Sequence, residues 1–203
     1  MPWAWYSGGW DNAVAGHADP LFQYHHQPLN YFANYSVGQP GRAHLKDETE
    51  FMTVASAGTL PAVSFVKPLG EENEHPGYAS TDNGEKHLVD LIKAIVNGPE
   101  GKTTTIVVTY DEFGGAWDHV IPPGQGENAT AGPSDEFGPG TRIPALIISG
   151  GFRKSGIDRT SYDTTSILAT IEHLYALAPL DTRFGRDAKI ADLLHALVAS
   201  GRG

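Results

Sequence analysis

The 203-residue chain contains no cysteine, which excludes disulfide bonds and thiolate metal sites. It also lacks long apolar runs, and none approaches the roughly 20 residues that a membrane-spanning helix needs. Stable membrane insertion is therefore not expected. The first residues do not combine a basic segment with an apolar one, so no signal peptide is visible. These absences leave the cellular compartment open.

Basic residues are scarce: 14 Lys and Arg stand against 24 Asp and Glu, for a formal net charge of -10. Such a balance disfavours binding to nucleic acid or to anionic membranes. Apolar residues make up 40% of the chain, too many for a disordered protein. The 24 glycines and 14 prolines are spread out and mark no single linker, and no internal repeats are present. The length suits a single domain over residues 1–203, or part of a larger one.

The most informative stretch, residues 103–120, reads T-T-T-I-V-V-T-Y-D-E-F-G-G-A-W-D-H-V. Its first eight residues are mainly β-branched or apolar and predict a buried, central parallel strand. Asp111 and Glu112 follow at once, where ligands bind in open α/β sheets. Neighbouring carboxylates repel unless a cation or proton lies between them, and a hard divalent metal is the usual solution. The alternative is a pair that caps the next element or faces water.

Periodicity along the rest of the chain predicts an α/β fold, with a parallel or mixed sheet flanked by helices on both faces. The expected strands are residues 3–6, 62–66, 103–110 and 145–149, and the expected helices are residues 44–57, 82–97, 164–177 and 187–198. The order strand, helix, strand between residues 62 and 110 indicates a βαβ unit. Residues 121–141, rich in Gly, Pro and acidic residues, predict a flexible loop.

In two of the expected helices, the sequence pattern predicts which side chains face the core. In residues 44–57, Phe51 and Ala55 are expected on the apolar face, whereas Asp47 and Glu48 are expected on the opposite, polar face. The 82–97 helix places its apolar residues at the spacing of one buried face. These residues are Leu88, Leu91, Ile92 and Ile95.

Imidazoles occur in two segments that could line a pocket. The pair His25 and His26 lies in the aromatic stretch 20–35, where the competing interpretation is one buried and one exposed histidine in a packed loop. His75 lies in the polar loop 70–80 after the 62–66 strand. That loop would share an edge with Asp111 if the two strands are parallel. Arg142 either holds an anion or, as we favour, forms a salt bridge that pins its loop.

Several segments together resemble one known family. They are W-A-W-Y-S-G-G-W, F-Q-Y-H-H-Q-P-L-N-Y-F-A-N-Y, L-P-A-V-S-F-V-K-P-L-G-E-E-N-E-H-P-G-Y, T-Y-D-E-F-G-G-A-W-D-H-V, G-P-G-T-R-I-P and Y-D-T-T-S-I-L. In this order they are similar to the phosphoesterase family of bacterial acid phosphatases and phospholipases C, within the alkaline phosphatase-like superfamily. The resemblance covers nearly the whole chain. It implies an alkaline phosphatase-like fold that corresponds to the C-terminal half of the catalytic domain.

The resemblance implies a metal-dependent phosphoric ester hydrolase with a divalent cation and a phosphate ester substrate. Asp111 and Glu112 match metal-binding carboxylates, and His75 and His26 match active-site imidazoles. The family is often periplasmic or secreted. Two local departures are Phe113, where the family often has Asn or His, and Gly150, where it often has Pro.

A larger departure is that the family's Glu-Asn metal pair and its Ser or Thr nucleophile have no match in these 203 residues. We therefore expect the fold to be incomplete at the N-terminus. Three hypotheses follow: completion by a missing N-terminal half, a truncated form with metal-water hydrolase or esterase activity, or an inactive fragment that forms a homodimer through an uncovered sheet edge. A serine hydrolase is disfavoured because the chain has no G-x-S-x-G turn.

Overall fold

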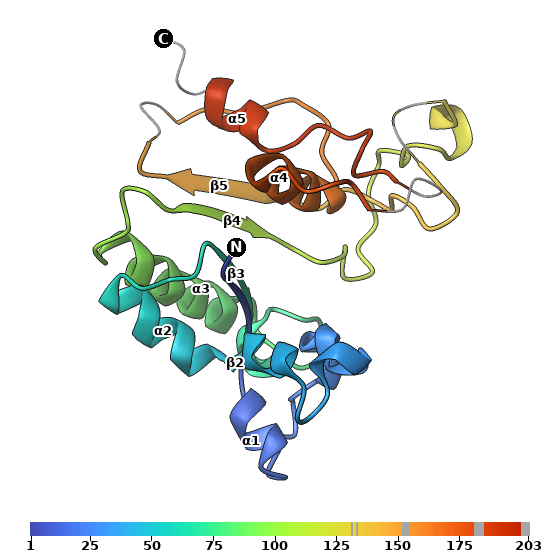
Figure 1. Ribbon diagram of the computed structural model, residues 1–203. Helices are drawn as coiled ribbons and strands as arrows, with labels where there is room; N and C mark the ends of the chain where they lie inside the picture. The colour runs from blue at the N-terminus through green and yellow to red at the C-terminus, as the bar shows by residue number, and fades with distance from the viewer. Residues whose placement is uncertain (131, 133, 152–154, 181–184, 200–203) are drawn as a thin grey trace. The chain divides into compact units, whose positions relative to one another are not determined.

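The computed structural model describes residues 1–130, 132, 134–151, 155–180 and 185–199. The backbone divides into two compact units, Met1–Thr104 (unit 1) and Thr105–Gly203 (unit 2). Each unit has its own sheet and its own helices (Figure 1). A single domain over residues 1–203 stays a prediction.

Unit 1 is built on a three-stranded parallel sheet with the order β2-β1-β3. The strands are β1 (Trp3–Ser7), β2 (Leu45–Asp47) and β3 (Val63–Lys67). Ser7 lies in register with Asp47 on one side and with Lys67 on the other. All three strands therefore end at the same edge, where an α/β sheet presents its ligand-binding loops. The predicted α/β class is confirmed.

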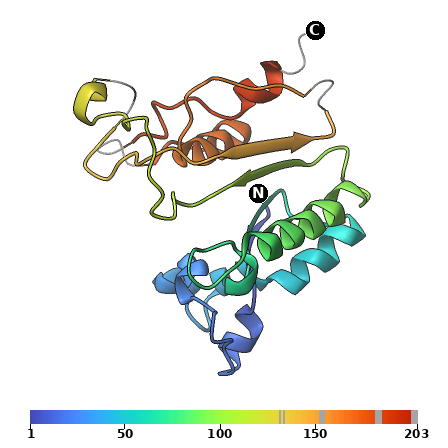
Figure 2. The ribbon, with the colours of Figure 1, turned by 180° about the vertical axis from the view of Figure 1, so that it is seen from behind.

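Helices α2 (Glu48–Ala57) and α3 (Thr81–Val96) lie side by side in unit 1 (Figures 1 and 2). The Asp47 carboxylate caps α2 by accepting a hydrogen bond from the backbone N–H of Thr49 at 3.0 Å. Gly58 ends the helix in the left-handed conformation, with φ of 69°. The N-cap of α3 is Ser80, whose hydroxyl accepts from Asn83 N–H at 3.2 Å, so the helix begins one residue before the predicted start at residue 82.

The core of unit 1 contains large side chains from the sheet and both helices. Tyr6 and Phe51 are each only 2% exposed, and their rings meet edge to face with centroids 5.4 Å apart. Leu91 and Ile95 of α3 are also buried, which confirms the apolar face predicted for this helix. A second cluster contains Trp10, Ala13, Phe22 and Leu45.

The predicted 44–57 helix is too long, and the prediction of its polar face is wrong. Residues 45–47 form β2, and the helix begins at Glu48. Asp47 and Glu48 are buried, although both were expected on the polar face. Once the helix starts at Glu48, the spacing of Glu48, Phe51 and Ala55 places all three on one side, and that side is the buried one.

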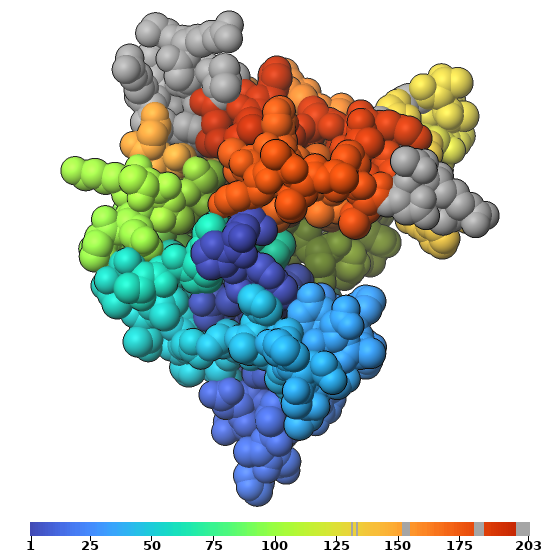
Figure 3. Space-filling view, viewed as in Figure 1, coloured from blue at the N-terminus to red at the C-terminus, as the bar shows by residue number. Residues whose placement is uncertain are grey.

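Between β1 and β2 the chain runs through short helical turns rather than long elements. These are α1 (Trp10–Val14), η1 (Tyr24–His26), η2 (Pro28–Tyr31), η3 (Ala33–Tyr35) and η4 (Pro40–His44). Figure 3 shows much of this segment in blue on the surface of unit 1. Tyr31 and Phe32 are 66% and 60% exposed. The segment thus combines buried anchors such as Phe22 with exposed aromatic rings.

Unit 2 contains a two-stranded antiparallel sheet, in which β4 (Thr105–Thr109) pairs with β5 (Ala145–Ser149). The prediction of a central parallel strand at residues 103–110 is therefore wrong, and no fully buried residue occurs in β4. The predicted βαβ pairing is also absent from the described residues, because β3 and β4 belong to different sheets. An apolar run specifies a strand but not its partner, which explains the error.

The helices of unit 2 are α4 (Thr165–Tyr175) and α5 (Leu194–Ala199). The first matches the predicted 164–177 helix, whereas residues 187–193 of the predicted last helix are not helical. Within 121–141, residues 131 and 133 lie outside the described residues, and the single helical turn described there is η6 (Gly126–Asn128). The flexibility of this loop stays a prediction. Among the described residues, no helix has both the length and the apolar character of a membrane span.

Candidate functional site

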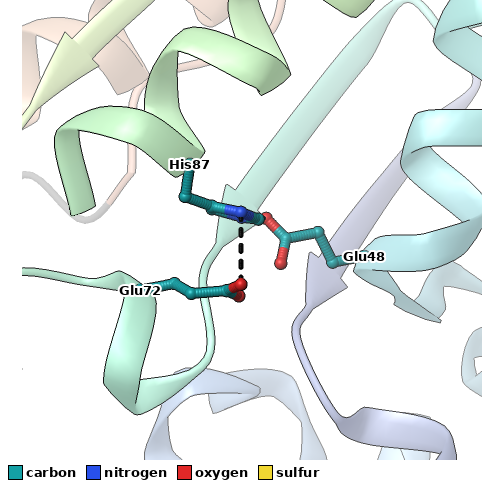
Figure 4. Close-up of side chains that lie close together, drawn as sticks. All are labelled: Glu48, Glu72 and His87. Carbon is teal, nitrogen blue, oxygen red and sulfur yellow. Dashed lines mark hydrogen bonds and ion pairs between the residues drawn. The ribbon is translucent and has the colours of Figure 1, made fainter. Parts of the chain in front are cut away.

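Three ionisable side chains meet beyond the carboxyl edge of the unit 1 sheet. Glu48 directly follows β2, Glu72 ends the turn η5 (Gly70–Glu72) after β3, and His87 comes from α3. His87 Nε2 lies 2.8 Å from Glu48 Oε1, and His87 Nδ1 lies 3.5 Å from Glu72 Oε1. Figure 4 shows the imidazole between the two carboxylates. Three separate elements therefore converge on one cluster, which we call the Glu48–Glu72–His87 cluster.

Close backbone approach makes room for the Glu48 carboxylate. A Cβ atom added at Gly8 would lie 2.9 Å from Glu48 Oε2 and 2.6 Å from the backbone nitrogen of Leu69. Glycine at this position therefore lets the end of β1 pass beside both α2 and the start of η5. Glu48 is 5% exposed, and a carboxylate at that depth requires a compensating charge or hydrogen bond.

The cluster changes the acid-base behaviour of its members. The hydrogen bond to Glu48 raises the pKa of the His87 imidazole, although partial burial opposes this change. Burial raises the pKa of the Glu72 carboxyl; His87 lowers it, and Glu48 and Glu71 raise it further. The cluster therefore favours a positive charge between its carboxylates. An imidazolium ion or a bound cation can supply that charge.

One histidine of the His25-His26 pair is buried and the other is exposed, as the interpretation of a packed loop predicts. His26 is buried at 7% exposure, whereas His25 is exposed, and the two rings meet edge to face at 4.7 Å. The Trp5 indole donates a hydrogen bond to the His26 backbone carbonyl at 2.8 Å. This contact ties η1 to β1, so the backbone of His26 is fixed against the sheet.

His75 is exposed on the loop that follows η5. Its Nδ1 lies 2.8 Å from the Pro76 carbonyl oxygen, and its ring stacks on Tyr78 with centroids 4.4 Å apart. A carbonyl oxygen only accepts, so Nδ1 carries the hydrogen. In the neutral ring, Nε2 then holds the lone pair. The loop therefore presets one tautomer of the His75 ring, with Nε2 as its acceptor atom.

Asp111 and Glu112 are exposed at the end of β4, and each carboxylate is oriented by its own loop. Asp111 Oδ1 accepts from Glu112 N–H at 3.1 Å, and Glu112 Oε2 accepts from Gly114 N–H at 2.8 Å. Gly114 and Gly115 have φ of 63° and 75°, which favours glycine in this turn. These oxygen donors fit a hard divalent cation, but two carboxylates supply fewer than the usual six or more ligands.

The loop after Asp111 and Glu112 is held by an ion pair. Arg142 Nε and Nη2 donate to the Asp118 oxygens at 2.8 and 2.9 Å in a bidentate contact. The salt-bridge interpretation of Arg142 is thus confirmed. Hydrogen bonds from Arg142 and from the Val120 backbone lower the pKa of Asp118 well below its usual range. His119 is exposed and lies 3.5 Å from Asp118.

Replacing Arg142 by alanine should raise the pKa of Asp118 toward its ordinary value, because both side-chain donors are lost. Since folding lowers this pKa, the Asp118 contribution to stability is present above about pH 4 and declines as the pH falls below that value. Arg142→Ala should weaken that decline. Carboxyl NMR titration and thermal melts at pH 7 and pH 3 measure the two effects. Arg159→Ala is the control, and an unchanged Asp118 pKa in Arg142→Ala contradicts the prediction.

The predicted site residues are divided between the units: His26 and His75 lie in unit 1, and Asp111 and Glu112 lie in unit 2. Their assembly into one site stays a prediction. Sequence reasoning missed Glu48 and His87 as site residues. A detectable signal was present, because each lies on the buried face of its helix, Glu48 three residues before Phe51 and His87 four before Leu91.

Comparison with known proteins places the chain in a family. Residues 1–178 match the model of the Phosphoesterase family. The chain belongs to the Phosphoesterase family. This match confirms the family resemblance, and it spans both the Glu48–Glu72–His87 cluster and the Asp111-Glu112 pair.

Several relatives in the Phosphoesterase family carry phospholipase C names. Non-specific phospholipase C6 of Arabidopsis thaliana is 28% identical over 153 residues, which cover 64% of this chain and 29% of the relative. Non-hemolytic phospholipase C of Burkholderia pseudomallei is 30% identical over 176 residues, with coverages of 71% and 25%. Phospholipase C B of Mycobacterium tuberculosis is 31% identical over 150 residues, with coverages of 66% and 29%. The matched region is thus less than a third of each relative.

Proposed function

We propose that this chain carries part of the active site of a metal-dependent phosphoric ester hydrolase. The observation that supports this most strongly is the Phosphoesterase family match over residues 1–178. The similarity to proteins named phospholipase C agrees with it. The chain aligns with less than a third of the length of each of these relatives. The activity of a whole enzyme is therefore a proposal for this chain.

In this proposal Asp111 and Glu112 hold a divalent cation, together with ligands from outside this pair. A bound cation supplies a Lewis acid that polarises a phosphoryl oxygen. The two carboxylates are already oriented by the backbone N–H groups of Glu112 and Gly114. Their exposure leaves the site open to a ligand from solvent. Magnesium, manganese, calcium and zinc are the ions to compare, because carboxylate oxygens bind all four.

The imidazoles His75 and His26 act on the phosphoryl group. The neutral His75 ring carries its hydrogen on Nδ1, so Nε2 can accept a proton from an attacking water molecule and later deliver it to the leaving oxygen. His26 is buried beside His25 and is anchored through its carbonyl, which suits a group that stabilises phosphoryl oxygens. A phospholipid is the proposed substrate, on the basis of the relatives' names.

The test is hydrolysis of aryl phosphate monoesters, aryl phosphate diesters and phosphatidylcholine by the purified chain, with and without each divalent metal. We expect metal-dependent turnover of at least one ester. Circular dichroism verifies that the protein is folded in every assay. A folded chain without turnover under all conditions contradicts the proposal for this chain and favours an inactive fragment instead.

The proposed role of His75 predicts a defect in turnover rather than in binding. His75→Gln should lower kcat roughly 100-fold with little change in KM, because glutamine cannot transfer a proton. The limb of the pH-rate profile that belongs to the imidazole should also disappear. His17→Gln, an exposed histidine outside the proposed site, is the control. An unchanged kcat in His75→Gln would remove this residue from the mechanism.

A further inference from the structure

We propose that the Glu48–Glu72–His87 cluster is a binding site for a zinc-class divalent transition-metal ion, separate from the Asp111-Glu112 pair. One ligand atom from each of the three residues lies within 4.8 Å of the other two. The donor set, two carboxylates and one imidazole, suits zinc with a water molecule as a fourth ligand. Imidazole also distinguishes the cluster from an all-oxygen site for calcium or magnesium.

Burial separates this cluster from an ordinary group of surface acids. The side chains of Glu48 and His87 are only 7% and 19% exposed, and that of Glu72 is 39% exposed. The cluster is thus closed on the α2 and α3 sides and accessible at Glu72. Such an arrangement gives an ion an entry path and two preset ligands.

The local backbone supports the positions of two of the ligands, Glu48 and His87. Glu48 starts α2 directly after the cap residue Asp47, and Gly8 lets its carboxylate lie beside β1. His87 lies three residues after the buried Gly84 of α3, on the face that packs inward. Figure 4 shows the side chains of these elements pointing toward one another.

A metal here would join three elements of unit 1. Glu72 lies three residues before His75, so the ion would fix the η5 end of the loop that carries the proposed proton-transfer residue. The α2 and α3 ligands would in turn hold that end against the helix pair. We therefore assign the ion a structural role, and its binding can be measured without any enzyme activity.

The experiment measures Zn²⁺ affinity of the full chain by competition with a chromophoric chelator, together with the thermal midpoint with and without Zn²⁺. All variants carry Asp111→Asn, so that the Asp111-Glu112 pair of unit 2 contributes less to the measured Zn²⁺ binding. We expect one bound Zn²⁺ and a raised midpoint, since an ion that binds only the folded state stabilises it. Glu48→Gln and His87→Gln should each weaken Zn²⁺ binding at least about tenfold and reduce the rise in the thermal midpoint.

Matched controls separate ligand loss from general damage. Glu50→Gln removes a nearby carboxylate of α2 that contacts Lys46 instead, and His119→Gln removes an exposed imidazole. Both should keep the Zn²⁺ affinity of the Asp111→Asn background protein. If Glu48→Gln does not fold, His87→Gln decides the result. Zn²⁺ binding that is absent, or that survives both cluster variants, overturns the proposal and leaves an imidazolium ion as the charge between the two glutamates.

Discussion

Asp111→Asn should reduce ester hydrolysis by roughly 1000-fold or more. A Lewis-acid metal contributes several kcal/mol to transition-state stabilisation, and each 1.4 kcal/mol is about tenfold in rate. Asparagine keeps the side-chain oxygen that accepts from Glu112 N–H, so the loop should retain its shape. Steady-state kinetics over a metal titration measure the loss. The remaining activity should need far more metal than the wild type.

Glu136→Gln is the matched control for this result, because Glu136 is an exposed carboxylate of unit 2 outside the proposed site. It should behave as the wild type. Equal activity of Asp111→Asn and wild-type protein at every metal concentration would falsify the assignment of Asp111 as a ligand. Loss of activity with an unchanged metal dependence would argue for a different role at the same position.

Phe51→Ala should lower the free energy of unfolding by about 3–5 kcal/mol, the usual cost of removing a buried phenyl ring. Phe51 is only 2% exposed and meets the Tyr6 ring at 5.4 Å between α2 and β1. The loss is a large part of the roughly 5–15 kcal/mol that stabilises a typical domain. Urea unfolding followed by tryptophan fluorescence reports mainly on unit 1, which contains Trp3, Trp5 and Trp10, three of the four tryptophans.

Phe32→Ala removes the same ring from a site that is 60% exposed, so it should change the free energy of unfolding by less than about 0.5 kcal/mol. The pair tests whether the sheet and α2 form one cooperative core. A Phe51→Ala variant as stable as Phe32→Ala would contradict the packing described for unit 1. Because Glu48 shares the buried face of α2, Phe51→Ala should also weaken Zn²⁺ binding at the Glu48–Glu72–His87 cluster.

Much of the fold could be predicted because its signals are local. Strands β1, β3, β4 and β5 and helices α3 and α4 lie close to their predicted positions. Patterns of apolar residues and helix caps involve residues only a few positions apart, so they can be recognised in the sequence. The start of α2 was misplaced because Leu45 and Lys46 also fit a helical pattern, and only pairing with β1 makes them a strand.

The sequence by itself determined the family, through motifs such as D-E-F-G-G-A-W-D-H-V, and with it the expected roles of His26, His75, Asp111 and Glu112. It also determined the α/β class and the buried face of α3. Only the tertiary structure decided that β4 pairs with β5 in an antiparallel sheet, and that Glu48, Glu72 and His87 meet. Strand partners and side-chain clusters join residues 15 to 44 positions apart, and no local pattern encodes such contacts.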